Sequence, residues 1–284
     1  FIGRNNRNKI SVFFNDYQIL KNYYLLYEEY VEEAKNNSVH IQYDHRYDYV
    51  KGYGNVKVGF RSNDILSDYD FSAVNLEMIN TTALGKLDLK TRFFAQWGDG
   101  TDIPFESSLL FAGANQEELL ESKFTYARGL FPDEWTTFGT TTSHFHIGGG
   151  LNVRGYSGYL IAQEGRDGEI YQVYTGSSGS SISMELEFDR LVRRQLISFI
   201  KMDPYLFADA GSIVYEEING KNYFSDIRMD AGIGSAFTWS WWGPLETVKP
   251  LTVRIDFPFF LNRPPYEETD YIKFRYVVGI NRAF

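Results

Sequence analysis

The chain has 284 residues, with 28 Lys and Arg against 37 Asp and Glu, which gives a formal net charge of −9. This acidic balance argues against a nucleic-acid partner, because nucleic-acid binding needs a concentrated basic face. The sequence contains no cysteine, which excludes disulfide bonds and thiolate metal sites. No apolar run reaches the length of about 20 residues that a membrane-spanning helix requires. The chain starts with neither an initiator Met nor a signal-peptide pattern, so we expect the start to lie within a longer protein.

Aromatic residues make up 17% of the chain, although its mean hydropathy is −0.33. They alternate with charged residues instead of gathering among Leu, Ile and Val. Such alternation with aromatic enrichment is typical of a transmembrane β-barrel, whose strands face lipid on one side and water on the other. A soluble β-sandwich or lipocalin-like barrel has the same two-residue period and remains the alternative.

The first third of the chain contains five strand-like segments. Their positions are Lys9–Ile19, Val39–Tyr49, Val56–Arg61, Ser72–Asn80 and Leu87–Trp97. In the last of these, Leu87 and Leu89 lie opposite Asp88 and Lys90, as the two-residue period of a strand requires. The segment Tyr23–Val31 fits either a further strand or one face of a helix.

The alternation stops between Gly98 and Ser180. Within this interval, Asn115 and Glu118 have the spacing of a capping box and predict a short helix through Glu121. A connection this long is usually functional or disordered. It also contains a glycine run followed by Arg154. The glycines let the backbone pass close to a neighbouring wall, and the arginine offers five donors suited to a carboxylate.

Five further alternating strands follow this interval. They are Ser181–Arg190, Asp203–Tyr215, Asp226–Trp239, Leu251–Phe260 and Tyr271–Phe284. Each is about ten residues long or more, enough to cross a bilayer at the tilt of a barrel strand. The total is ten strands, or eleven with the ambiguous segment. Because single-chain bacterial barrels have even strand numbers, either ten strands close on themselves or the chain is part of a larger barrel.

Three motifs in the second half resemble those of a known family. Val153-Arg154-Gly155-Tyr156 is similar to a VRGF/Y signature at the tip of a loop folded into a barrel lumen. Phe207-Ala208-Asp209-Ala210-Gly211 is similar to an FxDxG signature on a later strand, and two alternating strands close the chain at Phe284. Together they resemble the C-terminal β-barrel of the BamA-type outer-membrane assembly factor and surface-antigen superfamily. The family's sixteen strands and periplasmic repeats do not fit in this chain, and Arg282 replaces an apolar residue of the terminal signal.

The resemblance implies an all-β fold: an antiparallel transmembrane β-barrel over residues 1–284, with ten or eleven strands in this chain. These strands either close on themselves or form the C-terminal part of a sixteen-stranded barrel. The loop 98–180 would fold into the lumen, where Arg154 would pair with Asp209. The residues that the resemblance assigns to this lock are Arg154, Gly155, Tyr156, Asp209, Gly211 and Glu187. The last strand would form a weak seam with the first, and its outward residues are Ile272, Phe274, Tyr276 and the terminal Phe284.

The function implied is insertion, assembly or translocation of proteins at the bacterial outer membrane. The partners expected are the lipid bilayer and other outer-membrane or periplasmic proteins. One alternative is that the barrel anchors a larger surface or periplasmic enzyme, such as a peptidase, whose catalytic domain precedes this chain. Another is a soluble lipid- or ligand-binding barrel, which the inward Arg, Asp and Lys rows disfavour.

Sequence motifs of enzymes are missing. HExxH, GxSxG and P-loop patterns do not occur. His144 and His146 share one side of an extended segment and could bind a metal, but no further ligand stands beside them, which favours a surface or loop role. Glu185 and Glu187 face the same way and fit a lumen charge network better than an acid–base pair. We therefore predict no catalysis, no cofactor and no metal.

Overall fold

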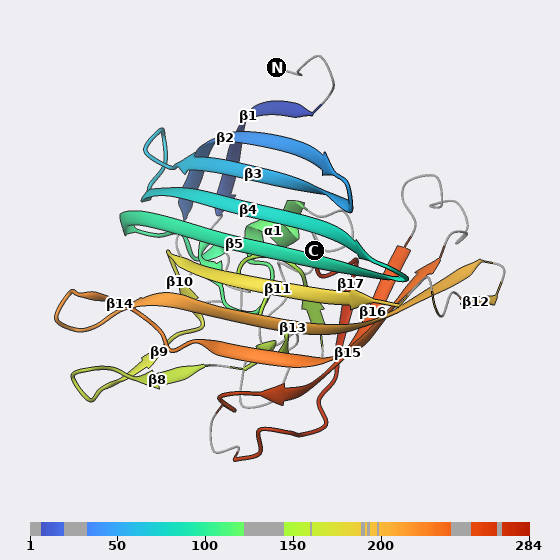
Figure 1. Ribbon diagram of the computed structural model, residues 1–284. Coiled ribbons are helices and arrows are strands. Elements are labelled where there is room, and N and C mark those ends of the chain that lie inside the picture. Colours follow the sequence, from blue (N-terminus) through green and yellow to red (C-terminus); the bar gives the residue numbers. More distant parts are fainter. Residues whose placement is uncertain are drawn as a thin grey trace.

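The structure, a computed structural model, describes residues 7–19, 33–121, 145–159, 161–188, 191, 194–197, 199–239, 251–265 and 269–284. One large, mostly antiparallel sheet dominates it (Figure 1). Ten strands follow one another in this sheet: β1 (Asn8–Ile19), β2 (Ala34–Tyr49), β3 (Gly52–Ser62), β4 (Asp70–Leu84), β5 (Leu87–Asp102), β11 (Gly179–Glu187), β13 (Ile200–Glu216), β15 (Arg228–Trp239), β16 (Leu251–Leu261) and β17 (Val277–Ile280). Two short strands, β12 (Arg194–Ile197) and β14 (Asn222–Phe224), pair with β13. The all-β prediction is confirmed at this level.

The predicted strand segments correspond to these ten strands, with one clear error. The segment Tyr271–Phe284 was expected to be a full strand, but β17 covers only its residues Val277–Ile280. Its ladder with β16 ends at the Asp256–Val277 pair and resumes as a single bridge between Phe260 and Ile272. Pro258 lies between these points and has no backbone N–H for the ladder. The ambiguous segment 23–31 lies outside the described residues.

The sheet is open. In the described part of the chain, β1 and β17 are not paired, so a barrel of ten strands closing on themselves is not formed. The far edge of β17 instead pairs in parallel with β7 (Phe145–Ile147), which belongs to the long connection. Among the described residues, no helix is long and apolar enough to cross a membrane.

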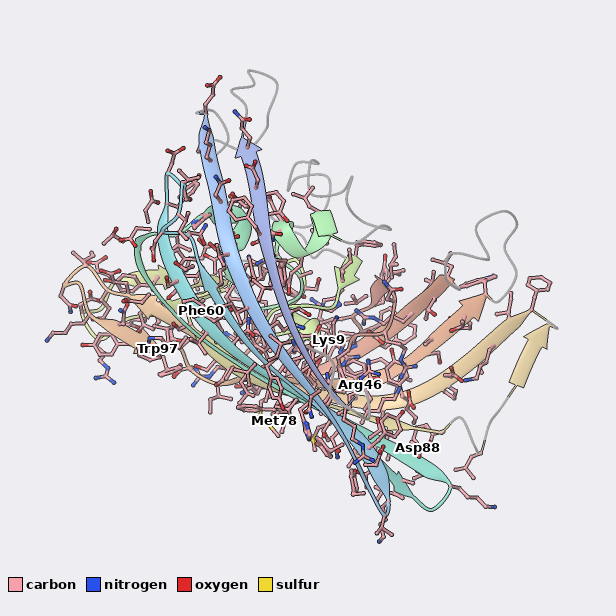
Figure 2. All side chains as sticks on the ribbon, turned by 90° about the horizontal axis from the view of Figure 1, so that it is seen from above. Lys9, Arg46, Phe60, Met78, Asp88 and Trp97 are labelled. Carbon is pink, nitrogen blue, oxygen red and sulfur yellow. The ribbon has the colours of Figure 1, made fainter. Side chains whose placement is uncertain are left out.

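The two faces of the sheet differ sharply in character. One register row across β1 to β5 consists of apolar side chains that are all exposed: Val12, Ile41, Phe60, Val74 and Trp97. A second row joins Met78, Phe93 and Ile182. Figure 2 shows Phe60, Met78 and Trp97 on the side of the sheet opposite to the short helix α1. We call the side with these residues the outer face.

The inner face carries buried charged residues and is covered by the long connection. An inner row runs directly across four strands through Arg92, Ser183, Asp209 and Asp230, all of which are buried. Because side chains alternate along a strand, the same strands present apolar groups outward and charged groups inward. The alternation of apolar and charged residues in the sequence therefore corresponds to the outer and inner faces of the sheet.

We call the described residues of 103–178 the plug. Its elements are η2 (Phe105–Ser107), β6 (Leu109–Leu110), α1 (Gln116–Glu121), β7, η4 (Arg154–Tyr156), β8 (Ala162–Glu164), β9 (Ile170–Gln172) and β10 (Thr175–Gly176). The predicted capping box is confirmed, because Asn115 and Glu118 each accept a 2.9 Å hydrogen bond from the other's backbone N–H. It opens the one α-helix of the described residues.

The plug has a hydrophobic core of its own, which the sequence analysis did not predict. Buried side chains from widely separated parts of the plug pack together: Leu109, Phe111, Leu151, Val153, Tyr156, Tyr159, Ile161, Val173 and Tyr174. Ile213 and Tyr215 of β13 and Leu261 of β16 complete this core. The plug is thus packed onto the inner face by a core that it shares with β13 and β16.

Candidate functional site

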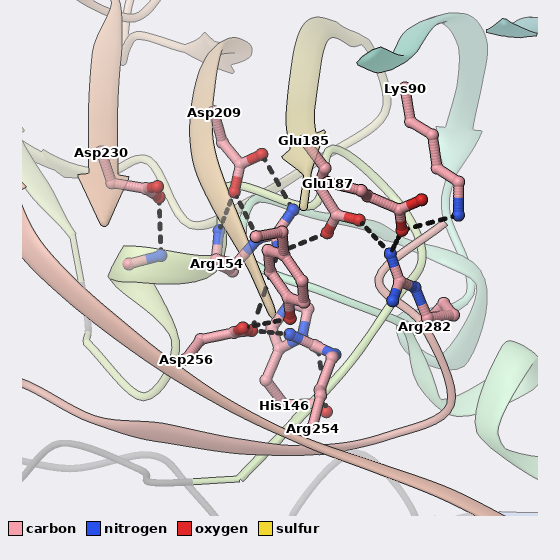
Figure 3. A network of polar contacts seen from close by, with 12 residues as sticks. Lys90, His146, Arg154, Glu185, Glu187, Asp209, Asp230, Arg254, Asp256 and Arg282 are labelled. Carbon is pink, nitrogen blue, oxygen red and sulfur yellow. Dashed lines mark hydrogen bonds and ion pairs between the residues drawn. The ribbon is translucent and has the colours of Figure 1, made fainter. Parts of the chain in front are cut away.

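The centre of the inner face is occupied by Arg154, at the start of η4 in the plug (Figure 3). Its side chain is fully buried. Nε donates to Oδ2 of Asp209 at 2.7 Å, and Nη2 lies 3.3 Å from Oδ1 of the same carboxylate. Nη1 donates to Oε1 of Glu185 at 2.8 Å. The guanidinium also lies 4.4 Å from the centroid of the Phe207 ring, so it is bound by charge and by an aromatic face.

The strand register explains how acids from four strands reach this point. Asp209 of β13 lies directly opposite Asp230 of β15. On its other side, Asp209 lies opposite Ser183 of β11, and Glu185 follows two residues later on the same face of β11. Asp256 of β16 completes the set, with Oδ2 3.7 Å from Nη1 of Arg154. Figure 3 shows the carboxylates of Asp209, Glu185 and Asp256 around the arginine, and Asp230 bound to a backbone N–H beside it. One plug residue therefore ties several strands together.

Gly155 binds the sheet through its backbone. Its N–H donates to Oδ2 of Asp230 at 2.6 Å, a hydrogen bond from the plug backbone to β15. A Cβ atom at position 155 would lie only 2.6 Å from Cβ of Asp230. Glycine is thus required for the close approach of η4 to β15. Gly211 has a similar role on β13, since a Cβ there would lie 2.8 Å from Cγ2 of Val153.

Tyr156, two residues after Arg154, binds the plug to the segment that follows β16. Its hydroxyl lies 3.1 Å from Oδ1 of Asn262 and 3.1 Å from the carbonyl oxygen of Arg263, both after β16. Its ring packs edge-on against Phe111 within the plug core. Burial raises the pKa of Tyr156 well above its usual value, so the hydroxyl stays neutral.

The charge state of Arg154 is also fixed by its surroundings. Burial by itself opposes the charged form, but the nearby carboxylates of Asp209, Glu185 and Asp256 more than offset that effect. The pKa of Arg154 is therefore raised well above its usual value. The residue remains a permanent cation and holds the plug by ion pairing.

Glu187 is buried on the same face of β11 as Glu185. It pairs with Nζ of Lys90 at 2.9 Å and with Arg282, with no contact to Arg154 among the described interactions. Glu185, two residues earlier on the same face, is the direct partner of Arg154 and also accepts from Nη2 of Arg282 at 2.9 Å. Arg282, which departs from the family's terminal signal, thus turns inward and joins the network.

Further members were missed by sequence reasoning. Arg254 of β16 pairs with Asp256 and contacts the ring of His146, while Tyr205 donates to the same aspartate. The sequence signal that could have identified Arg254 and Asp256 is their charge at inward positions of β16, but they belong to no recognised motif. The predicted surface role is wrong for His146, which is buried in β7. His144 lies outside the described residues, and no cluster of His, Cys, Asp or Glu in the described part could hold a metal.

A second group of contacts holds the first part of the plug to β2 and β3. Arg61 pairs with Glu117 of α1 and donates to Oγ of Ser107 at 2.7 Å, while Asn36 donates to Glu106 at 2.6 Å. Burial raises the pKa of Glu106, although hydrogen bonds from its own backbone and from Asn36 work against the shift. This second group spans the opposite half of the sheet from Arg154.

The seam residues lie on the outer face. Ile272, Phe274 and Tyr276 are exposed, and the Phe274 ring lies 5.7 Å from that of Phe257 on β16. Phe284 is partly buried after the end of β17. These residues are placed beside β16 and make no contact with β1 among the described interactions.

Chemically, this arrangement binds the plug to the sheet and fixes its position. The carboxylates closest to Arg154 are engaged by guanidinium groups or, for Asp230, by a backbone N–H, which suits a structural lock between plug and sheet.

Comparison with models of known protein families, and with proteins of known function, found no match to this chain.

Proposed function

We propose that this chain is a transmembrane β-barrel domain of the BamA type, acting in the insertion, assembly or translocation of proteins at the bacterial outer membrane. The observation that carries the proposal is the outer face, where register rows of exposed apolar side chains run across successive strands. Continuous exposed apolar surface marks a site of membrane or protein contact. The charged inner face beneath it is the arrangement expected of a barrel with lipid outside.

The position of β1 as the first strand of the described sheet fits a barrel that further strands complete. An unpaired backbone group costs several kcal/mol in hydrocarbon, so a strand edge cannot face lipid. In the part of the chain that the structure describes, β1 is the first strand of the large sheet and forms its ladder with β2. We infer that further antiparallel strands close the sheet, as in the sixteen-stranded barrels that the chain resembles.

The membrane part of the proposal is tested by folding the full-length protein into phosphatidylcholine vesicles. We expect extraction to require detergent, and we expect unheated samples to migrate differently from boiled ones in gel electrophoresis. Depth-dependent quenching by brominated lipids should reach a Trp97 fluorophore in a variant that retains this tryptophan alone. Recovery in the aqueous phase without detergent would exclude an outer-membrane barrel.

The assembly part is tested by activity. Vesicles containing the full-length protein should accelerate the folding of an unfolded outer-membrane β-barrel substrate, relative to vesicles with an unrelated barrel of similar size. The unrelated barrel is the matched control, because it reproduces bilayer defects without the Arg154 lock. Equal folding rates in both vesicle types would refute an assembly role while leaving the membrane assignment intact.

A second candidate function is that the barrel anchors a larger enzyme. The plug favours the anchor function, because a hydrophobic core packed onto the inner face is expected of a barrel whose lumen stays filled. The full-length gene separates the two candidates: a catalytic domain upstream supports the anchor, and periplasmic repeats support assembly. An anchor should also show the equal folding rates described above.

A further inference from the structure

Four rings stand side by side on the outer face of β2. They belong to Tyr43, His45, Tyr47 and Tyr49, which follow Ile41 at every second position and so lie on its side of the strand. Neighbouring ring centroids are 6.3–6.5 Å apart, and the ring planes differ by 18–30°. Every second residue of a strand repeats at about 6.6 Å, so the rings lie beside one another along the strand. We call these four residues the aromatic row.

Two glycines of β3 let the last two rings of the row lie flat on the sheet. A Cβ atom at Gly54 would lie 2.4 Å from Cζ of Tyr47, and one at Gly52 would lie 2.8 Å from Cζ of Tyr49. The rings therefore cross β3, and the Tyr49 hydroxyl donates to the carbonyl oxygen of Thr81 on β4 at 3.2 Å. One side of each ring covers a glycine, and the other side faces away from the sheet.

Hydrogen bonds from two asparagines hold the row in place. Nδ2 of Asn80 on β4 donates to the Tyr49 hydroxyl at 2.9 Å, and Oδ1 of Asn80 accepts from the Tyr47 hydroxyl at 3.4 Å. On β1, Oδ1 of Asn8 lies 2.6 Å from Nδ1 of His45. Amide groups are costly on an apolar surface unless they are hydrogen-bonded, so these asparagines serve the rings that they contact.

The aromatic row is a local feature of the sheet. The register row that starts at Tyr49 runs on through residues without rings as far as β15: Gly52, Thr82, Leu89, Leu186, Leu206 and Ile233. The next ring in this register row is that of Phe257 on β16. A girdle of aromatic residues would place rings at this level on successive strands. The aromatic row is therefore a separate site, confined to β2 and its neighbours.

Other groups beside the aromatic row complete the site. On β3, Val56 lies opposite His45 and Val58 lies opposite Tyr43, so apolar side chains flank the half of the row that is farther from the turn. At its other end, Lys51 is exposed in the turn between β2 and β3. A ligand that fits has an apolar part, an anion for the lysine and a cation for the ring faces. A phospholipid with a zwitterionic headgroup has all three.

We propose that the aromatic row binds the headgroup of a zwitterionic phospholipid, with the ammonium group on the faces of Tyr47 and Tyr49 and the phosphate beside Lys51. The negative face of an aromatic ring attracts an ammonium ion, and choline-type cations are recognised in this way. The acyl chains then continue along the apolar outer face. This inference rests on the proposed function, because it assigns a specific lipid to the face that is proposed to contact the bilayer.

Native mass spectrometry of the full-length protein in detergent tests the inference. The protein is titrated with three dioleoyl lipids that differ only in headgroup: phosphatidylcholine, phosphatidylglycerol and glucosyl diacylglycerol. The first two share the phosphate, so the difference between them isolates the ammonium group. We expect phosphatidylcholine to bind about three- to tenfold more tightly than phosphatidylglycerol, as one or two cation–π contacts would give.

Variants assign this preference to the aromatic row. Tyr47→Leu with Tyr49→Leu should remove the preference, whereas Phe93→Leu, which removes a similarly exposed ring elsewhere on the outer face, should retain it. Tyr47→Phe with Tyr49→Phe keeps the ring faces and should also retain the preference, which separates ring chemistry from a folding defect of the Leu variant. Lys51→Gln should weaken the binding of both phospholipids by the same factor, because both carry the phosphate.

Three outcomes would overturn the inference. They are equal or tighter binding of phosphatidylglycerol by the wild type, equal losses in the Leu double variant and in Phe93→Leu, and tightest binding of the glucosyl lipid, which would identify a sugar site. Gel mobility in vesicles separates the two proposals. A chain that inserts but shows no headgroup preference loses only this inference, whereas recovery in the aqueous phase removes both.

Discussion

Arg154 and Asp209 form a fully buried ion pair between the tip of the plug and strand β13, with Nε 2.7 Å from Oδ2. The two residues are 55 positions apart in the sequence. The same guanidinium reaches Glu185 on the neighbouring strand at 2.8 Å. The pair therefore fixes where the plug lies and how two strands lie beneath it, because the geometry that satisfies one carboxylate also constrains the other.

Removing the charge of Asp209 should destabilise the protein strongly. Asp209→Asn leaves Arg154 buried with a weaker partner, and breaking a buried pair costs about 3–5 kcal/mol. The measurement is the free energy of unfolding in urea, in detergent micelles. The control is Asp48→Asn, because the Arg7–Asp48 pair is exposed and such pairs contribute about 0–1 kcal/mol. Equal losses at both sites would refute the lock.

The two glutamates of β11 should differ in importance. Glu185→Gln removes a carboxylate shared by Arg154 and Arg282, whereas Glu187→Gln affects a part-buried pair with Lys90 and a contact to Arg282. We expect the larger loss of unfolding free energy for the Glu185 variant. Limited proteolysis of the plug gives an independent reading, since loss of Arg154 contacts should expose residues near 154 first. A larger effect of Glu187→Gln would contradict the observed network.

Gly155→Ala should prevent close packing of the plug tip. The new Cβ would lie 2.6 Å from Cβ of Asp230, so β15 or η4 must shift. The comparison is Gly168→Ala, where φ is +85° but nothing lies within 4 Å, so the cost is backbone strain of about 1–2 kcal/mol. We expect the Gly155 variant to lose more stability and to show faster exchange of the backbone amide at position 155 than the wild type. A loss no greater than that at Gly168 would argue against tight contact.

Attachment of the plug near β2 should depend on pH through Glu106. Because burial raises its pKa in the folded state, the folded protein binds a proton more tightly than the unfolded chain does. This contribution to stability is fully present below the ordinary value of 4.5 and is lost as pH rises through the raised pKa. Relative to Glu106→Gln, the wild type should therefore lose stability as pH increases from 4.5. Parallel pH profiles of the two proteins would show that Glu106 is not responsible.

A charge on the outer face should be tolerated poorly in a bilayer. Met184→Arg places a cation at an exposed, outward position in the middle of β11, and such changes cost about 2–4 kcal/mol near the bilayer midplane. Val50→Arg, at the fully exposed turn between β2 and β3, is the control and should have little effect. Unfolding free energies in phosphatidylcholine vesicles provide the measurement. Similar values for both variants would place Met184 in water.

Much of the fold follows from local features of the sequence. Two-residue alternation located the ten strands, and the spacing of Asn115 and Glu118 located α1, because both signals arise from residues close together in the chain. The expectation that Arg154 meets Asp209 came from resemblance of two short motifs. Alternation also placed Glu185 and Glu187 on one face, but it could not say which of them reaches Arg154.

Tertiary structure alone decided the rest, because these features depend on contacts between distant residues. The register of β11, β13, β15 and β16 selects Glu185 over Glu187 as the partner of Arg154 and brings Asp256 within reach. The apolar residues of the plug have no regular period, so their common core appears only when the segment folds back on β13. The early end of β17 and its pairing with β7 likewise depend on Pro258 and on a loop more than a hundred residues away. Sequence periodicity determines which way side chains point, whereas register and packing determine what they meet.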